Sequence, residues 1–271
     1  MAKEDKIKKI IQIRKELVRD ALLAIYQAGS GHTGTSLSVV DIIATLIGYP
    51  FLRGWWEKSP ERDLLILSKG HAAPTLYAAL AMAGYIDRQE LEKLRHIEGI
   101  LEGHPSTKIP GVDSPSGSLG VGAAVAVGRA LADKFSERDR RIFVILGDGE
   151  LQEGIVWECF SIARSLRLKN LFFIIDRNGM QLSGPTESIR RMEPITAKLR
   201  SFGLNVFVTN GHDIEHLIET FEKAIRVDGP IAIVAYTVKG KYLESIEWDE
   251  RSHGYIPDSK TIESILARWD E

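Results

Sequence analysis

The feature that most constrains the fold is an alternation of short apolar runs with longer amphipathic segments. Runs typical of strands buried on both faces of a sheet occur at residues 64–67, 142–146, 171–176, 205–209 and 231–236. Apolar residues at helical spacing predict helices over 5–28, 38–48, 72–84, 87–97, 119–135, 153–168, 190–202, 213–227 and 259–270. Such alternation predicts right-handed crossovers, and therefore an α/β fold with a mostly parallel central sheet and helices on both faces. We expect one domain over residues 1–271.

Composition and charge narrow the class of protein. The net charge of −2, without a basic stripe, argues against a nucleic-acid partner. The N-terminal segment is charged and amphipathic, and no apolar run approaches the length of a membrane span, so we expect a cytoplasmic protein that does not enter membranes. The single cysteine, Cys159, cannot form an internal disulfide and is predicted to be a small buried apolar residue.

Polar oxygen ligands follow two of the predicted strands. Asp148 stands between Gly147 and Gly149 where the run 142–146 ends, and Asn178 lies just past the run 171–176. In neighbouring parallel strands these positions meet, and their hard oxygen atoms suit Mg²⁺ or Ca²⁺. Magnesium commonly completes its shell with phosphate oxygens, so this is a candidate diphosphate site, with glycines that admit the phosphates and a helix N-terminus behind them.

A second interpretation of the same stretch is a tight turn in which Asp148 satisfies backbone N–H groups. For the tripeptide alone the turn is favoured. Asn178 at the end of the next predicted strand shifts the balance toward the metal site.

Four histidines lie in four separate glycine-rich loops. They are His32 in "GSGHTGTS", His71 in "LSKGHAAP", His104 in "LEGHPS" and His253 in "RSHGYIP". Imidazoles that converge from several loops suit a site that binds phosphates and moves protons near neutral pH. Each one alone is better explained as a loop hydrogen-bonding group, and a tetrahedral zinc set is disfavoured because no pair has the spacing of a HExxH or CxxC site.

These motifs resemble those of thiamine diphosphate-dependent enzymes, and transketolase in particular. "GDGELQEG" and "RNGMQLSG" are similar to the cofactor- and metal-binding motif, and "GHTGTSLSVVDI", "LSKGHAAPTLYAAL", "GHPSTKIPGVDSPSGSLGVG" and "SHG" to the family's other motifs. The resemblance covers nearly the whole chain.

The resemblance assigns roles around the metal and the diphosphate. Asp148, Asn178 and the backbone carbonyl of Met180 would hold the metal, and Gly149 would contact the diphosphate. The family often has an acidic or amide residue directly before the asparagine, where this chain has Arg177. That departure leaves the ligands intact and alters the local charge balance.

The histidines also receive roles from the resemblance. His71 and His253 would contact the diphosphate, and His253 would also face the reacting carbon. His32 and His104 would lie near the substrate hydroxyls and assist proton transfer. The other three histidines match no catalytic motif and are predicted to lie on the surface: His96, His212 and His216.

The segment "GSLGVGAAVAVGRALA" has glycines in the wrong order for a dinucleotide fingerprint and no strand before it, so its small residues are predicted to allow close helix packing. By resemblance Gly117, Ser118 and Leu119 border the cofactor, although the family usually has proline at position 118. Glu153 has two open interpretations. It is a helix-dipole carboxylate, or a member of the family's carboxylate network between paired active sites.

The resemblance also implies a partner. In this family a glutamate on a second domain starts activation of the cofactor, and this chain has only one more predicted helix after "SHGYIPD". We therefore expect the N-terminal, diphosphate-binding subunit of a split transketolase that needs a separate C-terminal subunit, as an α2β2 heterotetramer.

The implied reaction moves a two-carbon ketol unit from a ketose phosphate to an aldose phosphate, as in the pentose phosphate pathway. Two alternatives remain open. One is another thiamine enzyme subunit, similar to 1-deoxyxylulose-5-phosphate synthase or to the E1 component of a 2-oxo acid dehydrogenase. The other is a non-catalytic regulatory protein that binds the cofactor.

Overall fold

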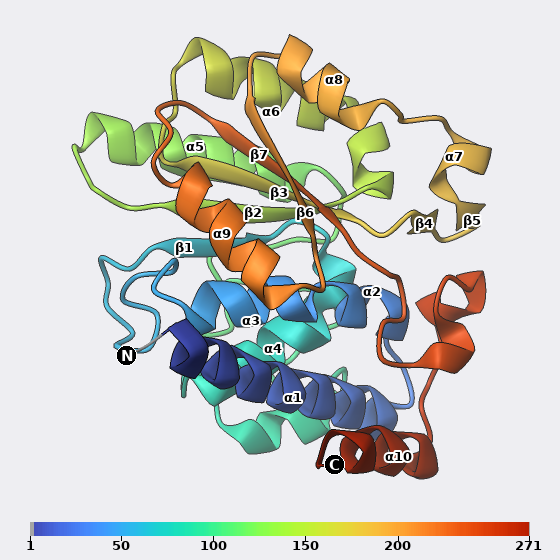
Figure 1. Ribbon diagram of the computed structural model, residues 1–271. Coiled ribbons are helices and arrows are strands. Elements are labelled where there is room, and N and C mark those ends of the chain that lie inside the picture. Colours follow the sequence, from blue (N-terminus) through green and yellow to red (C-terminus); the bar gives the residue numbers. More distant parts are fainter. Residues whose placement is uncertain (1–2, 271) are drawn as a thin grey trace.

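A single parallel sheet forms the centre of the protein. The structure is a computed structural model that describes residues 3–270. The strands are β1 (Leu64–Leu67), β2 (Ile142–Gly147), β3 (Leu171–Arg177), β6 (Asn205–Asn210) and β7 (Ile231–Tyr236). They lie in the order β1-β2-β3-β7-β6, and every neighbouring pair is parallel (Figure 1). The five predicted strands are confirmed to within one residue at each end.

Helices cover both faces of this sheet (Figure 1). One face carries α1 (Lys3–Ala28), α3 (Val40–Gly48), α4 (Ala73–Met82) and α9 (Ile214–Ala224). The other carries α5 (Val121–Phe135), α6 (Gly154–Ser165) and α8 (Ile195–Ser201). Side chains alternate along β3, with Phe172 and Ile174 in the first core and Phe173 and Ile175 in the second. The predicted fold class is therefore confirmed. Strands covered by helices on both faces must be apolar throughout, which explains the uninterrupted apolar runs in the sequence.

All five strands point the same way, so their carboxyl ends lie at one edge of the sheet. Ligand sites in open α/β folds lie at this edge. The glycine-rich loop after β3 lies there and contains a short hairpin of β4 (Met180–Gln181) and β5 (Gly184–Pro185), which the sequence did not predict. The last helix, α10 (Ser259–Asp270), packs on α1 and matches its predicted bounds.

Three predicted helices differ from the observed ones. The expected helix 87–97 is only a 3-10 segment, Arg88–Lys93, because Leu94 is extended and Arg95 takes a left-handed backbone with φ 60°. The expected helix 190–202 is reduced to α8, preceded by the single turn α7 (Thr186–Ile189), since Pro194 lacks an N–H and disfavours helical backbone before it. The segment expected as a helix over 38–48 is divided at Val39 between α2 (Thr33–Ser38) and α3.

Two predictions about small residues are confirmed. Cys159 is buried on the core-facing side of α6, and burial raises the pKa of its thiol to about 11. Gly122 on α5 packs so closely on the end of β1 that an added Cβ would lie 2.6 Å from the Cα of Ser68. Within residues 3–270, no helix combines the length and the apolar character needed to cross a membrane.

The packing of α6 on β3 gives a stability prediction. Phe160 is fully buried, and its ring lies 4.9 Å from that of Phe173. Phe160→Ala removes these contacts and leaves a cavity, so we expect the free energy of unfolding to fall by about 3–5 kcal/mol in urea titrations.

The matched control is Phe135→Ala at the end of α5, where the side chain is 80% exposed. This change is expected to alter the free energy of unfolding by less than about 0.5 kcal/mol. Equal losses for the two variants would contradict the packing described for α6.

Candidate functional site

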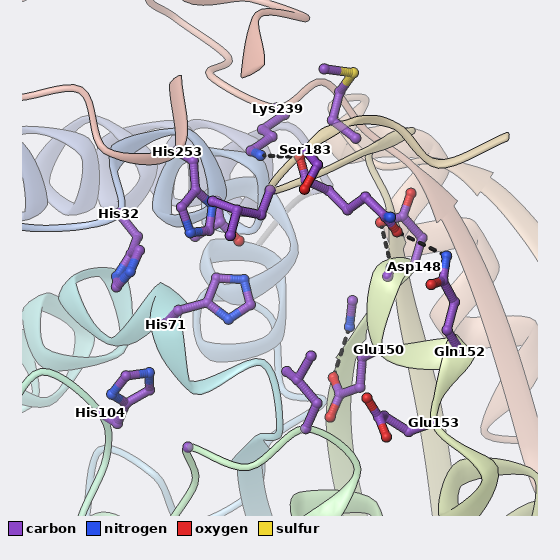
Figure 2. Close-up of a pocket in the computed structure, with 18 residues that line it drawn as sticks. His32, His71, His104, Asp148, Glu150, Gln152, Glu153, Ser183, Lys239 and His253 are labelled. Atoms are coloured by element: carbon purple, nitrogen blue, oxygen red, sulfur yellow. Dashed lines mark hydrogen bonds between the residues drawn. The ribbon is translucent and has the colours of Figure 1, made fainter. Parts of the chain in front are cut away.

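A cavity of about 440 Å³ lies at the carboxyl edge of the sheet, within the size range of small-molecule sites. Loops that follow four strands contribute to its walls, with His71 after β1, Asp148 after β2, Met180 after β3 and Lys239 after β7. His32 and His104 come from loops between helical segments. Figure 2 shows the polar side chains turned into this space. The full lining is His32, Thr35, His71, His104, Gly117, Leu119, Gly147, Asp148, Gly149, Glu150, Gln152, Glu153, Met180, Gln181, Leu182, Ser183, Lys239 and His253.

The four loop histidines meet in this cavity, as the sequence predicted. The ring centre of His32 lies 4.8 Å from that of His253, 5.7 Å from His71 and 6.1 Å from His104 (Figure 2). His32 directly precedes α2, His71 lies in the 3-10 turn before α4, and His253 ends a 3-10 turn near the C-terminus. Segments far apart in the sequence thus supply one cluster.

Burial keeps these imidazoles neutral. It lowers the pKa of His32 to about 4, with further contributions from His253 and Arg95. The pKa of His253 also falls to about 4, because of burial and then the charges of Lys239 and Lys69. Burial and Lys69 lower the pKa of His71 to about 2, and burial also lowers that of His104. At neutral pH each ring therefore has one donor nitrogen and one acceptor nitrogen.

A hydrogen bond fixes the proton position on His32. The guanidinium of Arg95 lies 3.1 Å from the Nδ1 atom of His32. Since a guanidinium only donates, Nδ1 must accept, and the ring proton is on Nε2. Arg95 has a left-handed backbone where the expected helix stops, and its guanidinium is the cation beside the histidine cluster.

The two predicted oxygen ligands lie on neighbouring strands. Gly147 at the end of β2 is paired with Asp176 of β3. Asp148 and Asn178 come one and two residues after this pair, so both lie at the same edge of the sheet. The Oδ2 atom of Asp148 accepts hydrogen bonds from Arg177 Nη1 (2.8 Å), Gly179 N (2.7 Å) and Thr186 Oγ1 (3.2 Å), whereas Oδ1 accepts one from Gly149 N (2.9 Å). The carboxylate satisfies backbone N–H groups, as the turn interpretation expected, and it also lines the cavity.

Asn178 is held by its neighbours. Its Nδ2 donates to Asp176 Oδ2 at 3.0 Å, and its Oδ1 accepts from the N–H of Met180 at 3.1 Å. Its side-chain orientation is therefore set, with the oxygen on the side of Met180, a cavity-lining residue. The pKa of Asp148 is raised, first by burial and then by the charge of Asp176, against the opposing effect of Arg177.

Asp176 joins the elements beneath the cavity and was not predicted. Its fully buried carboxylate accepts hydrogen bonds from Ser38, Lys69, Thr237 and Asn178. Burial alone would raise the pKa of Asp176, but the ammonium of Lys69 holds it below its usual value. Lys69 and Asp176 each lie close to the end of a strand. This position was the one signal in the sequence that could have singled them out.

Two further cavity residues were also missed. Glu150, 2% exposed, accepts hydrogen bonds from Ser68, from Gly120 N at 2.7 Å and from Gly147 N at 3.0 Å, and so connects the loop before α5 with the loop after β2. Lys239, also 2% exposed, donates to the carbonyl of Gln181 at 3.2 Å. Burial and the nearby Lys69 lower the pKa of Lys239 to about 8. Its position three residues after β7 was the available signal.

The predicted site residues line the cavity with two exceptions. Ser118 is exposed outside it, and Asn178 is buried behind its wall. Glu153 lies on the rim as the residue before α6, and its side chain makes no capping hydrogen bond to that helix. Among residues 3–270, no group of three or more His, Cys, Asp or Glu side chains is arranged to hold a metal by itself. Any metal here must take further oxygen ligands from amide, backbone, water or phosphate.

The prediction for the remaining histidines is confirmed for His96 and His216, which are exposed, and is wrong for His212. The His212 side chain is only 10% exposed. Its Nε2 accepts from the N–H of Val238 at 2.8 Å, and its Nδ1 lies 2.8 Å from the buried carboxylate of Asp41. His212 therefore helps to hold the segment that carries Lys239.

Comparison with known proteins agrees with this geometry. Residues 7–269 match the family described as transketolase, thiamine diphosphate binding domain. The chain is 33% identical over 265 residues to an apulose-4-phosphate transketolase subunit of Phocaeicola vulgatus, covering 96% of this chain and 94% of the relative. It is 38% identical over 269 residues to a 6-deoxy-6-sulfo-D-fructose transketolase subunit of a Clostridium species, covering 96% of each chain.

A solved structure shows the same fold. Transketolase from Campylobacter jejuni superposes with a TM-score of 0.86 at 31% identity, covering 95% of this chain and 42% of that one. The chain thus spans less than half the length of this enzyme and nearly the whole length of the two relatives from Phocaeicola and Clostridium.

The neutral histidines give a pH prediction. In the unfolded chain an imidazole binds its proton near pH 6.5, whereas folded His32 and His253 do so only near pH 4. The unfolded state then binds more protons between these values, so the stabilisation is complete above about pH 6.5 and is lost as the pH falls toward 4. We expect the midpoint of thermal unfolding to fall over this interval.

His32→Asn should flatten that dependence, while His96→Asn, on the surface, should leave it unchanged. NMR titration of the His32 ring checks the cause directly. A His32 that protonates near pH 6.5 in the folded protein would rule out this explanation.

Proposed function

This chain belongs to the transketolase family and carries its thiamine diphosphate-binding domain, and from that premise we propose that it is the diphosphate-binding subunit of a two-chain transketolase. The enzyme would transfer a two-carbon ketol unit from a ketose phosphate to an aldose phosphate. One observation carries the proposal: four neutral imidazoles and the Asp148 carboxylate face one cavity at the carboxyl edge of the sheet. We treat residues 1–271 as a single domain, since both cores share one sheet.

The residues present fit a divalent cation, Mg²⁺ or Ca²⁺. The three donors would be Asp148, Asn178 and the carbonyl of Met180, all hard oxygens. Within the described part of the chain, Asp148 Oδ1 accepts only the N–H of its neighbour Gly149, which leaves it lone pairs for a cation. The donor set also explains why residues 3–270 hold no metal-binding cluster of their own, because phosphate oxygens would complete the shell.

The cofactor would extend from this cation into the cavity. Gly149, His71 and His253 would contact the diphosphate, with Lys239 as an additional cation. Gly117 and Leu119 would border the rings, with Ser118 exposed between them outside the cavity, and Glu153 would stand at the rim toward a second active site. Thiamine diphosphate, when bound, supplies a nucleophilic carbon that takes over the two-carbon unit.

The protein's part in the reaction is to orient the sugar and to move protons. His32 carries its proton on Nε2 and can donate it to a substrate hydroxyl, because Arg95 occupies Nδ1. His104 and His253 are also neutral at pH 7, so each can accept a proton from a sugar hydroxyl and return it.

The partner would be a C-terminal transketolase subunit, in an α2β2 heterotetramer in the cytoplasm. Support comes from the two relatives that are named as subunits, which this chain covers over 94% and 96% of their length. Their names specify a sugar phosphate and a sulfonated sugar, so an anionic sugar is the expected substrate class here. A role in the pentose phosphate pathway is consistent with that class.

Removal of the metal-binding carboxylate is the first test of this proposal. Asp148→Ala should abolish magnesium-dependent binding of thiamine diphosphate, because no other carboxylate among the proposed ligands replaces it. Isothermal titration with and without Mg²⁺ measures the effect, and circular dichroism checks the fold.

Asp228→Ala, at an exposed position, is the matched control and should bind as the wild type does. His104→Asn should retain the cofactor and slow turnover in the complete enzyme. Magnesium-dependent binding that survives in Asp148→Ala would disprove the metal assignment.

The need for a second chain is the next test. The purified chain with Mg²⁺ and thiamine diphosphate should show no ketol transfer, and co-expression with the C-terminal subunit should restore it. A coupled assay with a ketose phosphate or pyruvate as donor separates a transketolase from the other thiamine enzymes. Full turnover by this chain alone, or preference for pyruvate, would refute the proposal.

A further inference from the structure

Arg177 joins the candidate metal site to a surface segment. Its side chain is 7% exposed at the end of β3. Nη1 donates to Asp148 Oδ2 at 2.8 Å, and Nη2 donates to Glu187 Oε1 at 2.9 Å and to Glu193 Oε1 at 3.3 Å. One guanidinium therefore contacts three carboxylates, of which only Asp148 lines the cavity.

We propose that Arg177 is a positioning residue that orients Asp148 before a divalent cation arrives and lowers the affinity of the site for that cation. The inference rests on the proposed metal-binding role of Asp148. Arg177 then competes with the cation for the negative charge of Asp148. Its contacts with Glu187 and Glu193 connect cation binding to the segment 186–193.

The two carboxylate oxygens of Asp148 differ in their hydrogen bonds. Oδ2 has three donors, Arg177, Gly179 and Thr186, while among residues 3–270 Oδ1 has only the N–H of Gly149. A cation can therefore bind at Oδ1 without displacing Arg177. It must then share one buried carboxylate with a guanidinium, and two positive charges at that separation repel each other with little screening.

The acidic partners keep the guanidinium in place. Glu187 and Glu193 are 39% and 41% exposed, and Glu187 also accepts the N–H groups of Met192 and Glu193. Burial opposes the charge of Arg177, but the hydrogen bond and charge of Asp148 raise its pKa above the usual value. The guanidinium of Arg177 therefore remains positively charged.

Removal of Arg177 has two opposite consequences. Without a divalent cation, Asp148 and the two glutamates lose their common counter-charge, so the protein is less stable. With the cation present, the repulsion is gone, and Gly179 and Thr186 still orient Asp148. A residue with only a structural role would lower stability under both conditions, which distinguishes the two roles.

The experiment compares Mn²⁺ binding to the full chain, measured by electron paramagnetic resonance with and without thiamine diphosphate. Arg177→Met is expected to bind Mn²⁺ about tenfold more tightly than wild type. Its thermal midpoint should fall without the metal and return toward the wild-type value in Mn²⁺. Arg177→Lys should restore most of the wild-type affinity, and Arg191→Met, at an exposed position nearby, is the matched control and should change nothing.

Glu193→Gln provides a second variant with the opposite sign. It removes one negative charge that partly offsets the charge of Arg177, so the guanidinium repels Mn²⁺ more strongly and Mn²⁺ should bind about threefold more weakly. Equal or weaker Mn²⁺ binding by folded Arg177→Met would overturn the inference. If that variant does not fold, unchanged affinity in Glu193→Gln overturns it. A wild-type protein that binds neither Mn²⁺ nor the cofactor contradicts the proposed function itself and removes the premise.

Discussion

The buried carboxylate of Asp176 is the interaction on which the rest of the site depends. It lies at the end of the central strand β3, and side chains from α2, from the loop after β1, from the residue after β7 and from the loop after β3 donate to it. A buried charge is tolerated only when it is paired and hydrogen-bonded. Because its donors come from separate elements, they must all be in place together, and this sets how the loops at the carboxyl edge lie relative to one another.

The same arrangement sets the electrostatics of the cavity. Lys69 pairs with Asp176 below, and Lys239 lies at the wall with a lowered pKa. Both cations favour an anion in the cavity, and both disfavour a proton on His253. The two lysines therefore add to the effect of burial in keeping His253 neutral. Asp148 and Arg177 extend this network of charges toward the surface through Glu187 and Glu193.

Much of the fold could be predicted because its signals are local. The strands on both sides of Asp148 are uninterrupted apolar runs, and they pair in parallel as expected. The failures occurred where a single residue overrides a periodic pattern. The apolar spacing over 87–97 continues past Arg95, but the left-handed backbone there ends the helical turn. His212 follows a strand in a polar stretch. Nothing local showed that its side chain would be largely buried beside Asp41, which lies in a helix far earlier in the sequence.

The sequence by itself determined the alternation of strands and helices, the glycine-rich loops, the four histidines and the Asp148–Asn178 pair, because each depends on residue type and spacing along the chain. The tertiary structure alone decided which charges meet. Lys69 with Asp176, Arg177 with Asp148, and Arg95 with His32 are pairs between separate segments. Such partners are set by strand order and loop position, and in a buried site they determine which groups are charged, oriented or neutral.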